Sequence, residues 1–426
     1  MKRLTFVFAS IIVSMLMVLT ACGPAATTPP PATQPPATQA PTTAPVATTA
    51  PTTAATTAPT QGAPVTLTIW DGYHAGGSEE TTVTDLVNKY KTAHPNVTID
   101  LLEVPFDQLF TKYETDTAAG GGPDMFTAPN DSMGNEVRAN LIAPIDTLVQ
   151  GKLTNYTQAG INGVTVDNKI YAVPGIAKAV GLYYNNSTVP NPPKTTDDLM
   201  ALVKSGKKLG FVNNGAYYIW GFWSGFGGTL MDSTGKCVAD QTTGFADALQ
   251  YLKDLQTAGA TIDSDEGKLD TAFKQGQLDM IFEGPWVLGD FEKALGSKLG
   301  VVAEPTGPKG AFMPMMGIDG WYVNPNSQNQ AAAVDLALYI FGQEGLTEYE
   351  NNAGDPAARS DVTPTDPLVK AFADIAAGGF PRPQTAEFGN YWGPFGDALT
   401  AVVSGTETAT AAVAKACATM NTANKK

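Results

Sequence analysis

The stretch from Val65 to Lys426 is predicted to form an α/β fold in two lobes. Its length is the first observation, because a stretch of this size exceeds what one hydrophobic core normally supports. The second observation is the order of patterns at its start, where strand-like segments alternate with helix-like ones. That order is typical of a parallel sheet with helices on both faces.

Five segments at the start of this stretch carry clear patterns. They are a strand over 65–70, a helix over 83–90, a strand over 97–104, a helix over 106–119 and a short buried strand over 124–126. Alternating apolar and polar residues mark the first strand, and apolar residues three and four apart mark the first helix. Ligands of parallel sheets bind beyond the carboxyl ends of the strands. We therefore expect ligand contacts at residues 71–74 and 127–132, which carry polar and aromatic side chains.

The first 22 residues have the layout of a secretory signal. Lys2 and Arg3 precede an apolar run over 4–19, which is short for a membrane span of about 20 residues. The following Ala21-Cys22 resembles the cleavage site of a bacterial lipoprotein signal. The resemblance implies that residues 1–21 are removed and that Cys22 carries lipid, so that the protein is extracytoplasmic and anchored to the cell membrane. An ordinary secretory signal with a chance cysteine is the alternative.

Residues 22–64 are predicted to form a lipid-anchored, disordered linker. They are almost entirely Ala, Pro, Thr and Gln, and none of them is charged. Such a composition has too little large apolar surface to offset the entropy of the chain. The linker would hold the folded part away from the bilayer. The sequence leaves open whether its threonines are glycosylated.

The charge of the chain argues against two classes of partner. The formal net charge is −15 at pH 7, from 41 acidic and 26 basic residues. Nucleic-acid binding requires basic surfaces, and so does direct binding of the folded part to anionic lipid. We therefore expect no nucleic-acid partner. The acidic balance favours solubility instead.

Histidine and cysteine are scarce. His74 and His94 are the only histidines of the chain, which leaves little scope for a His-rich metal site. We expect neither a metal nor another cofactor. With Cys22 lipidated, Cys237 and Cys417 remain as an even pair in an oxidising compartment. The sequence alone leaves open whether they form a disulfide.

An ordered set of short motifs carries a family resemblance. The motifs are Leu67–Trp70, Gly122–Phe126, Lys169–Pro174, Gly181–Asn185, Asn191–Thr195, Phe273–Gln277 with Met280, Glu283–Trp286 and Gly320–Asn324. In this order and spacing the chain resembles extracellular solute-binding proteins of ABC importers, in the branch that includes the maltose-binding protein. The resemblance covers essentially all of residues 65–426. No single motif is decisive, but the ordered set is specific.

The resemblance implies a two-lobe, type II periplasmic-binding-protein-like fold, in which each lobe is a mainly parallel sheet flanked by helices. Crossing segments are expected near 174–179, 319–323 and 365–380. The lobes are then discontinuous: residues 65–176 plus 323–368 form the N-terminal lobe, and residues 177–322 plus 369–426 form the C-terminal lobe. Such a protein is expected to be a monomer that closes as a hinge on its ligand.

The resemblance also implies an oligosaccharide ligand, most directly a malto-oligosaccharide, delivered to the permease subunits of an ABC transporter. A pyranose has an apolar face for aromatic rings and a rim of hydroxyls for carboxylates and amides. Tyr217, Trp286 and Trp392 fall on the sugar-stacking aromatics of the family, with Tyr218 beside the first of them. Asp131 falls on an acidic residue that bonds sugar hydroxyls.

Three further residues complete the expected substrate-binding set. Asp71 and His74 lie in the first loop at the sheet edge. Lys178 stands where the maltose-binding protein has a glutamate that contacts sugar, and it either bonds the ligand or pairs with a carboxylate. Where the family has further sugar contacts, the chain departs from it at Ala128, Ser132, Gly215 and Leu288. Tyr73, Trp223 and Trp321 are candidates to replace the missing contacts.

Catalysis finds little support in the sequence, and no catalytic residue is expected. The segment Phe222-Trp223-Ser224-Gly225 lacks the first glycine of a nucleophile elbow. Two alternatives to a malto-oligosaccharide importer stay open. The same fold could bind another solute, either a different sugar or a polyamine. The plentiful carboxylates also leave open an anchored glycan hydrolase.

Overall fold

The computed structural model describes residues 63–213 and 215–426. The predicted signal over 1–21, the lipidation site Cys22 and almost all of the predicted linker over 22–64 lie outside the described residues. Among the helices that are described, none is both long enough and apolar enough to cross a membrane.

The first of two large sheets contains six strands in the order β13-β12-β3-β1-β2, with β6 paired to β12 as well. These strands are β1 (Val65–Asp71), β2 (Val97–Glu103), β3 (Met125–Pro129), β6 (Ala172–Lys178), β12 (Met315–Val323) and β13 (Phe380–Pro381). β1 is parallel to both β2 and β3, whereas β12 is antiparallel to β3 and β6. The neighbouring helices and short strands are α1 (Ser78–Ala93), α2 (Phe106–Ala118), α3 (Met133–Arg138), α4 (Asp146–Val149), α5 (Gln158–Gly163), β4 (Thr165–Val166), β5 (Lys169–Ile170), α11 (Gln330–Ile340) and α12 (Gln343–Asn352).

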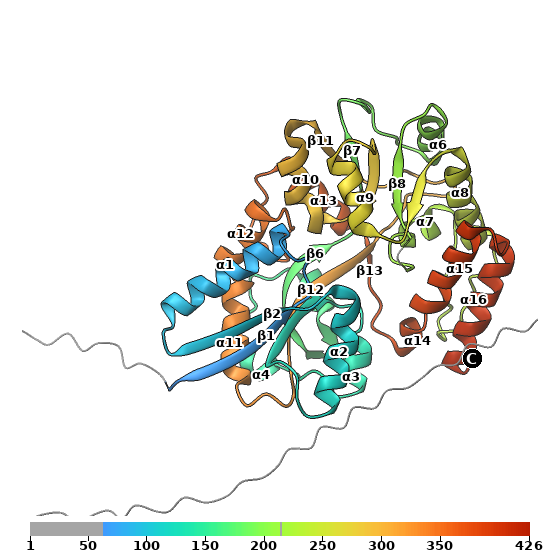
Figure 1. The fold of residues 1–426 in the computed structure, drawn as a ribbon. Coiled ribbons are helices and arrows are strands. Elements are labelled where there is room, and N and C mark those ends of the chain that lie inside the picture. The colour runs from blue at the N-terminus through green and yellow to red at the C-terminus, as the bar shows by residue number, and fades with distance from the viewer. Residues whose placement is uncertain (1–62, 214) are drawn as a thin grey trace, which may run out of the picture. The chain divides into compact units, whose positions relative to one another are not determined.

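Alternation along β1 determines which helices cover each face of the first sheet. Leu67 and Ile69 belong to a core cluster that also includes residues of α1, α11 and α12. Trp70 points the other way and belongs to a second cluster with Tyr113 of α2. Successive side chains of a strand point to opposite faces. The sheet is therefore covered on both sides, and Figure 1 shows α1 and α2 on either side of β1 and β2.

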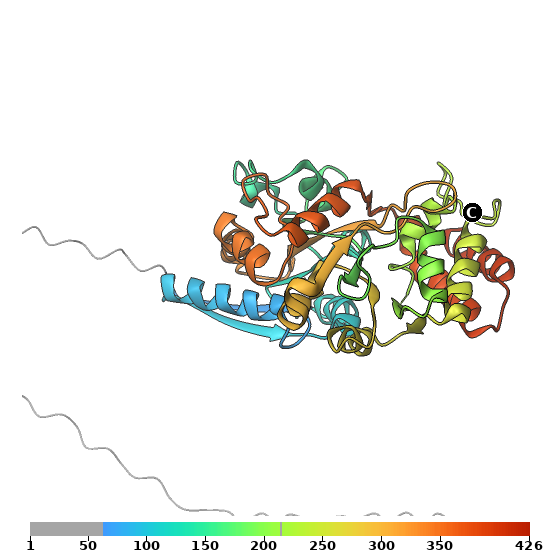
Figure 2. The same ribbon diagram turned by 90° about the horizontal axis from the view of Figure 1, so that it is seen from above.

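The second sheet contains five strands in the order β11-β7-β10-β8-β9. They are β7 (Gly181–Asn185), β8 (Leu209–Val212), β9 (Thr261–Asp263), β10 (Met280–Glu283) and β11 (Leu299–Val302). β8 is parallel to β9 and β10, and β7 is antiparallel to β10 and β11. Around it lie α6 (Thr196–Lys204), α7 (Trp220–Gly225), α8 (Gly244–Ala258), α9 (Glu266–Lys274), the turn η1 (Pro285–Val287), α10 (Leu288–Leu295), η2 (Gly296–Lys298), α13 (Pro367–Gly378), α14 (Ala386–Gly389), α15 (Trp392–Ser404) and α16 (Ala409–Asn424). Seen from above in Figure 2, α15 and α16 lie at the end of the described part opposite α1.

The chain passes between the sheets at points that matter for the site. β6 ends at Lys178 in the first sheet, and β7 begins at Gly181 in the second. The chain returns between β11 and β12, and β13 later pairs with the start of β12. These passages lie at or near the expected crossing segments. The proposed lobe boundaries themselves stay a prediction.

The five predicted segments match the first five elements, with one informative difference. α1 begins at Ser78, five residues before the predicted start. Its first turn is polar, yet Ser78, Glu79 and Thr82 are buried there. The apolar pattern could not reveal this turn, because the turn faces a polar site and not the core.

Trp223 and Trp321, two candidates to replace missing ligand contacts, are core residues. The Trp223 indole donates a hydrogen bond from Nε1 to the Tyr391 hydroxyl at 2.8 Å and stacks on Phe245. Trp321 on β12 is fully buried and packs near Phe341. Tyr73, the third candidate, has a different position and lines the cavity described below.

Cys237 and Cys417 form a disulfide. Their Cα atoms lie 5.4 Å apart, and 180 residues separate them along the chain. The bond joins the loop before α8 to α16. Asn421 of the same helix accepts a hydrogen bond from the backbone of Cys237 and donates one to it. The question that the sequence left open is therefore answered in favour of a bonded pair.

Candidate binding site

A cavity of about 290 Å³ lies between elements of the two sheets. From the first sheet it is lined by the loop after β1, the start of α2, the end of β3 and the strands β6 and β12. The second-sheet side contributes residues 215–218, the start of α9 and the turn η1. The carboxyl ends of β1 and β3 therefore reach the cavity, as the parallel β3-β1-β2 order leads us to expect.

Seven of the eight expected binding residues line this cavity: His74, Asp131, Lys178, Tyr217, Tyr218, Trp286 and Trp392. Asp71 is the exception, because it is fully buried at the end of β1 and does not line the cavity. Its Oδ1 accepts a hydrogen bond from the backbone N–H of Tyr73 at 3.2 Å. Burial raises the pKa of Asp71 to about 7. Asp71 thus holds the start of the loop that carries Tyr73 and His74.

Tyr217, Tyr218 and Trp286 form an aromatic wall on the second-sheet side. The Trp286 ring centroid lies 6.2 Å from that of each tyrosine. The sequence Gly284-Pro285-Trp286 explains how the indole is placed: Pro285 begins the turn η1, and the ring folds back over Gly284, where a Cβ would overlap it. Trp286 Nε1 donates a hydrogen bond to Glu266 Oε1 at 3.1 Å, which fixes the orientation of the ring.

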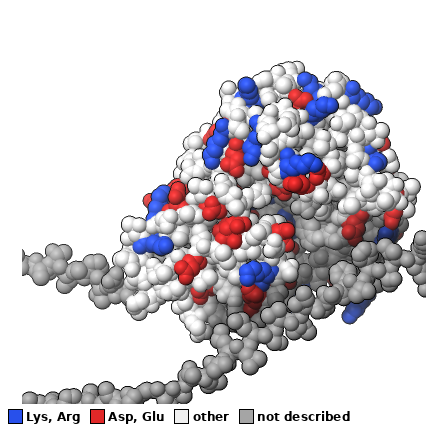
Figure 3. Space-filling view, in the orientation of Figure 1, with Lys and Arg blue, Asp and Glu red and all other residues white. Residues whose placement is uncertain are grey.

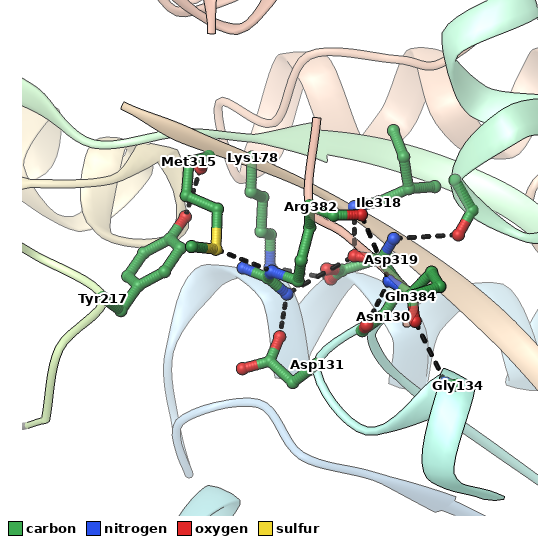
Figure 4. Close-up of polar contacts among 11 residues, drawn as sticks. Asn130, Asp131, Gly134, Lys178, Tyr217, Met315, Ile318, Asp319, Arg382 and Gln384 are labelled. Carbon is green, nitrogen blue, oxygen red and sulfur yellow. Dashed lines mark hydrogen bonds and ion pairs between the residues drawn. The ribbon is translucent and has the colours of Figure 1, made fainter. Parts of the chain in front are cut away.

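Arg382 is a buried arginine that the sequence analysis did not identify. Figure 4 shows its guanidinium between the first-sheet and second-sheet residues of the site. It forms an ion pair with Asp131, and its Nη1 donates a longer hydrogen bond to Asn130 Oδ1 at 3.4 Å. The guanidinium carbon also lies 5.1 Å from the centroid of the Tyr217 ring and 5.7 Å from that of Trp392. Arg382 therefore links the predicted acidic residue to two of the predicted aromatics.

Lys178, at the end of β6, forms ion pairs with two carboxylates. Its Nζ lies 2.8 Å from Asp319 Oδ2 on β12, and it also pairs with Glu79 in the first turn of α1. Burial by itself lowers the pKa of Lys178, but the charges of Asp319 and Glu79 outweigh burial and hold it well above its ordinary value. Of the two roles expected for Lys178, pairing with carboxylates is the one present here.

The same cluster contains more acid than base. Burial raises the pKa of Asp319 to about 6, and the nearby Lys178 opposes that rise. Asp355 lies close by, fully buried, and neither of its carboxylate oxygens has a hydrogen-bond partner among the described residues. Burial and the charge of Glu79 raise the pKa of Asp355 well above its ordinary value. Lys178 is thus the cation beside three acidic side chains, and it forms ion pairs with two of them, Glu79 and Asp319.

The lining of the cavity is acidic overall. Five carboxylates line it, namely Glu79, Asp107, Asp131, Glu266 and Asp319, against the two cations Lys178 and Arg382. Both cations are already paired with carboxylates. Within the described residues, no group of three or more His, Cys, Asp or Glu side chains could hold a metal ion. Figure 3 shows acidic and basic side chains interspersed on one outer face.

Besides Arg382, five lining residues with large or charged side chains escaped the sequence analysis as ligand contacts: Glu79, Phe106, Asp107, Glu266 and Asp319. Glu79, Phe106 and Glu266 lie in the first turns of helices, where their residue types are ordinary. Of these five residues, Asp319 is the one that the sequence could have revealed as unusual. It lies inside a strand that is otherwise buried, where a carboxylate is rare without a partner. The arrangement as a whole can cover an apolar ligand face with rings and accept hydrogen bonds around its rim.

The model of the family described as bacterial extracellular solute-binding protein matches residues 85–377. The chain belongs to this family. The galactooligosaccharide-binding protein of Bacillus subtilis (strain 168) is 26% identical to it over 80% of this chain and 85% of that protein. A maltooligosaccharide ABC transporter solute-binding lipoprotein of Streptococcus pneumoniae is 26% identical over 69% of this chain and 74% of that protein.

Solved structures of extracellular solute-binding proteins share the fold. The Thermus thermophilus maltotriose binding protein bound with maltotriose superposes with a TM-score of 0.78 and 25% identity, covering 84% of this chain and 100% of that one. The likeness confirms the predicted fold class of two α/β lobes. It also confirms the resemblance on which the binding residues were predicted.

Proposed function

We propose that this chain is the substrate-binding protein of an ABC carbohydrate importer, which captures an oligosaccharide and delivers it to the permease. A malto-oligosaccharide is the ligand that we put first. The observation that supports the proposal is the cavity itself, where an aromatic wall faces ion-paired carboxylates. Rings of this kind cover the C–H faces of pyranoses, and carboxylates accept hydrogen bonds from their hydroxyls. The ligands in the names of several relatives belong to the same class.

The two sheets supply complementary parts of the proposed site. Trp286 and Tyr217 would stack against sugar rings from the second-sheet side. Asp131 would accept hydroxyl hydrogen bonds from the first-sheet side, held in place by Arg382. A ligand that touches both sides binds the closed arrangement better than an open one, and this difference is what drives closure. The lobes that close would be residues 65–176 plus 323–368 and residues 177–322 plus 369–426, moving about the crossing strands.

The proposal includes an anchor. Residues 1–21 would direct export, Cys22 would carry lipid, and residues 22–64 would tether a monomeric binding domain near the permease in the same membrane. Tethering raises the local concentration of the domain at the transporter. Cys22→Ala should release the protein from cells into the medium, as followed by immunoblotting of membrane and soluble fractions. Retention of the variant in the membrane fraction would contradict the anchor but not the sugar site.

A thermal-shift screen tests the sugar proposal. Purified residues 65–426 are mixed with maltose, maltotriose, maltotetraose, galacto-oligosaccharides and spermidine, and the unfolding temperature is followed against concentration. A ligand that binds only the folded state stabilises it by RT ln(1 + [L]/Kd), about 2.7 kcal/mol at 100 times Kd. We expect the maltodextrins to raise the unfolding temperature and to stay chemically intact. Stabilisation by spermidine alone would overturn the sugar proposal, and steady release of shorter sugars would replace it with a hydrolase.

A further inference from the structure

Phe106 is an aromatic residue of the cavity lining that none of the contacts assigned above uses. We propose that Phe106 and Asp107, at the start of α2, form an outer subsite for one more pyranose ring at the mouth of the cavity. The subsite would select longer oligosaccharides over short ones. This inference rests on the proposed sugar-binding function and specifies the length of the ligand.

The exposure of Phe106 is the first observation. Its side chain is 42% exposed, and only Leu102, Met313 and Phe380 among the described large apolar residues are comparably exposed. Phe106 is the one of these four that lines the cavity. Two other aromatics of the lining, Tyr73 and Tyr218, are each 5% exposed. Tyr217, Trp286 and Trp392 are intermediate in exposure, so Phe106 is the most exposed Phe, Tyr or Trp of the lining. An exposed apolar surface continuous with a binding cavity indicates ligand contact.

The ring of Phe106 is held firmly enough to act as a shelf. It meets Phe110 edge-on, with ring centroids 5.8 Å apart and planes at 81°. On another side lies Gly72, where a Cβ would come within 3.5 Å of the Phe106 ring. Pro105 precedes the helix, and the fully buried Leu109 anchors its first turn. A stacking residue that is ordered before the ligand arrives loses little entropy on binding.

Asp107 supplies the polar half of the subsite. It follows Phe106 directly and lines the same cavity. It forms no ion pair among the described side chains, unlike Asp131, Glu79 and Asp319. One ring face and one carboxylate at its edge are what a single pyranose unit requires.

The size of the cavity favours an extended ligand. About 290 Å³ is at the lower end of the range of pockets that enclose a drug-sized ligand. A ligand of several sugar rings must therefore continue past the aromatic wall. Phe106 and Asp107 lie where such an extension would leave the cavity.

The test is a chain-length series. Isothermal titration of maltose, maltotriose, maltotetraose and maltopentaose is carried out with the wild-type chain, Phe106→Ala, Phe106→Tyr and Asp107→Asn. We expect Phe106→Ala to weaken the longer ligands about 3- to 10-fold, the effect of losing one stacked ring, and to leave the shortest binding ligand unchanged. Phe106→Tyr keeps a ring face and should retain wild-type affinities, and Asp107→Asn should show a smaller loss with the same length dependence.

Leu102→Ala is the control, because Leu102 on β2 is 47% exposed but does not line the cavity. It should change no affinity. A loss that is equal for all lengths, or wild-type affinity of Phe106→Ala for every length, would overturn the outer subsite and leave the sugar site standing. A wild-type chain that binds none of the four sugars would overturn the malto-oligosaccharide function together with the subsite.

Discussion

Arg382 and Asp131 form an ion pair that ties the segment after β13 to the loop after β3. The two residues are 251 positions apart in the chain, and both line the cavity. Arg382 is only 6% exposed and also reaches Asn130, while Gln384 bonds the backbone of the same loop. The acidic contact proposed for sugar hydroxyls is thus oriented by a residue from a distant part of the sequence.

Removal of the arginine should therefore affect both stability and binding. Arg382→Ala leaves Asp131 without its partner, and we expect a loss of about 1–3 kcal/mol in the free energy of unfolding. Ligand affinity should fall as well, since the Asp131 carboxylate is no longer held. Arg382→Lys should retain only part of the stability and part of the ligand affinity, because an ammonium cannot reproduce the planar fork of a guanidinium.

Urea unfolding and isothermal titration measure the two effects of Arg382→Ala. The control is Arg138→Ala, since Arg138 is exposed and its hydrogen bonds within the described residues go to Asn135 and the backbone of Gln384. The unfolding free energy of Arg138→Ala should stay within about 0.5 kcal/mol of the wild-type value. Equal effects of the two substitutions would mean that the buried ion pair has no special part in the site.

Lys178→Met should destabilise the protein in a pH-dependent way. Without the ammonium, the buried carboxylates Glu79, Asp319 and Asp355 lose the cation that balances them, and such losses cost about 3–5 kcal/mol. The folded-state pKa values of Asp319 and Asp355 then rise further above their unfolded values. An acid with a raised folded pKa takes up its proton as the pH falls, so the penalty disappears at low pH.

Urea unfolding of Lys178→Met between pH 4.5 and pH 8.5 checks this prediction. The unfolding free energy of Lys178→Met should fall below that of wild type by the largest amount at pH 8.5, and the difference should shrink toward pH 4.5. Lys89→Met is a suitable comparison, because Lys89 forms an exposed pair with Glu348. A deficit of the same size at every pH would indicate lost packing instead of unbalanced charge.

Glu136 on α3 should make the protein less stable as the pH rises. The residue is buried near Tyr113 and Tyr322, and its Oε1 has no hydrogen-bond partner among the described residues. Burial, with a smaller contribution from the charge of Glu114, raises the pKa of Glu136 from 4.5 to about 8. The folded state therefore holds a proton that the unfolded state has lost between these values, and stability falls across this window.

Glu136→Gln removes that penalty. We expect a gain of about 1–4 kcal/mol in unfolding free energy at pH 8.5 and almost none at pH 4.5. Thermal or urea unfolding at the two pH values gives the measurement. Glu344→Gln, at an exposed position in the first turn of α12, serves as the control and should show no comparable gain. A gain from Glu136→Gln that is the same at both pH values would argue against a buried titrating carboxylate.

The sequence predicted the fold better than the contacts of the site. Local patterns were sufficient for the first strands and helices, because alternation and helical spacing report which faces are buried. Such patterns do not distinguish Trp223, Trp286 and Trp321 from one another. Only the family resemblance, which includes the motif Glu283–Trp286, singled out the one of the three that lines the cavity. Arg382 lies between two prolines with no periodicity around it, and its partner Asp131 is brought to it by the tertiary fold alone.

Trp286 is the proposed binding residue whose substitution should separate affinity from stability most cleanly. The indole is half-buried and contributes one face to the cavity. Trp286→Ala should lower affinity for a bound maltodextrin about 10- to 100-fold, because the loss of a stacked ring face and its buried area costs about 1.4–2.8 kcal/mol. Trp286→Phe keeps a ring face but loses the Nε1–Glu266 hydrogen bond, so an intermediate affinity is expected.

Isothermal titration and thermal unfolding of the same samples make the distinction. Both Trp286 variants should unfold within a few degrees of wild type, because the indole is only partly buried where it packs against the core cluster. Tyr184→Ala is the matched control: Tyr184 is a half-buried aromatic on β7 that does not line the cavity. It should lower the unfolding temperature and leave affinity unchanged. If Trp286→Ala bound the maltodextrin with wild-type affinity, the proposed role of the aromatic wall in sugar binding would be wrong.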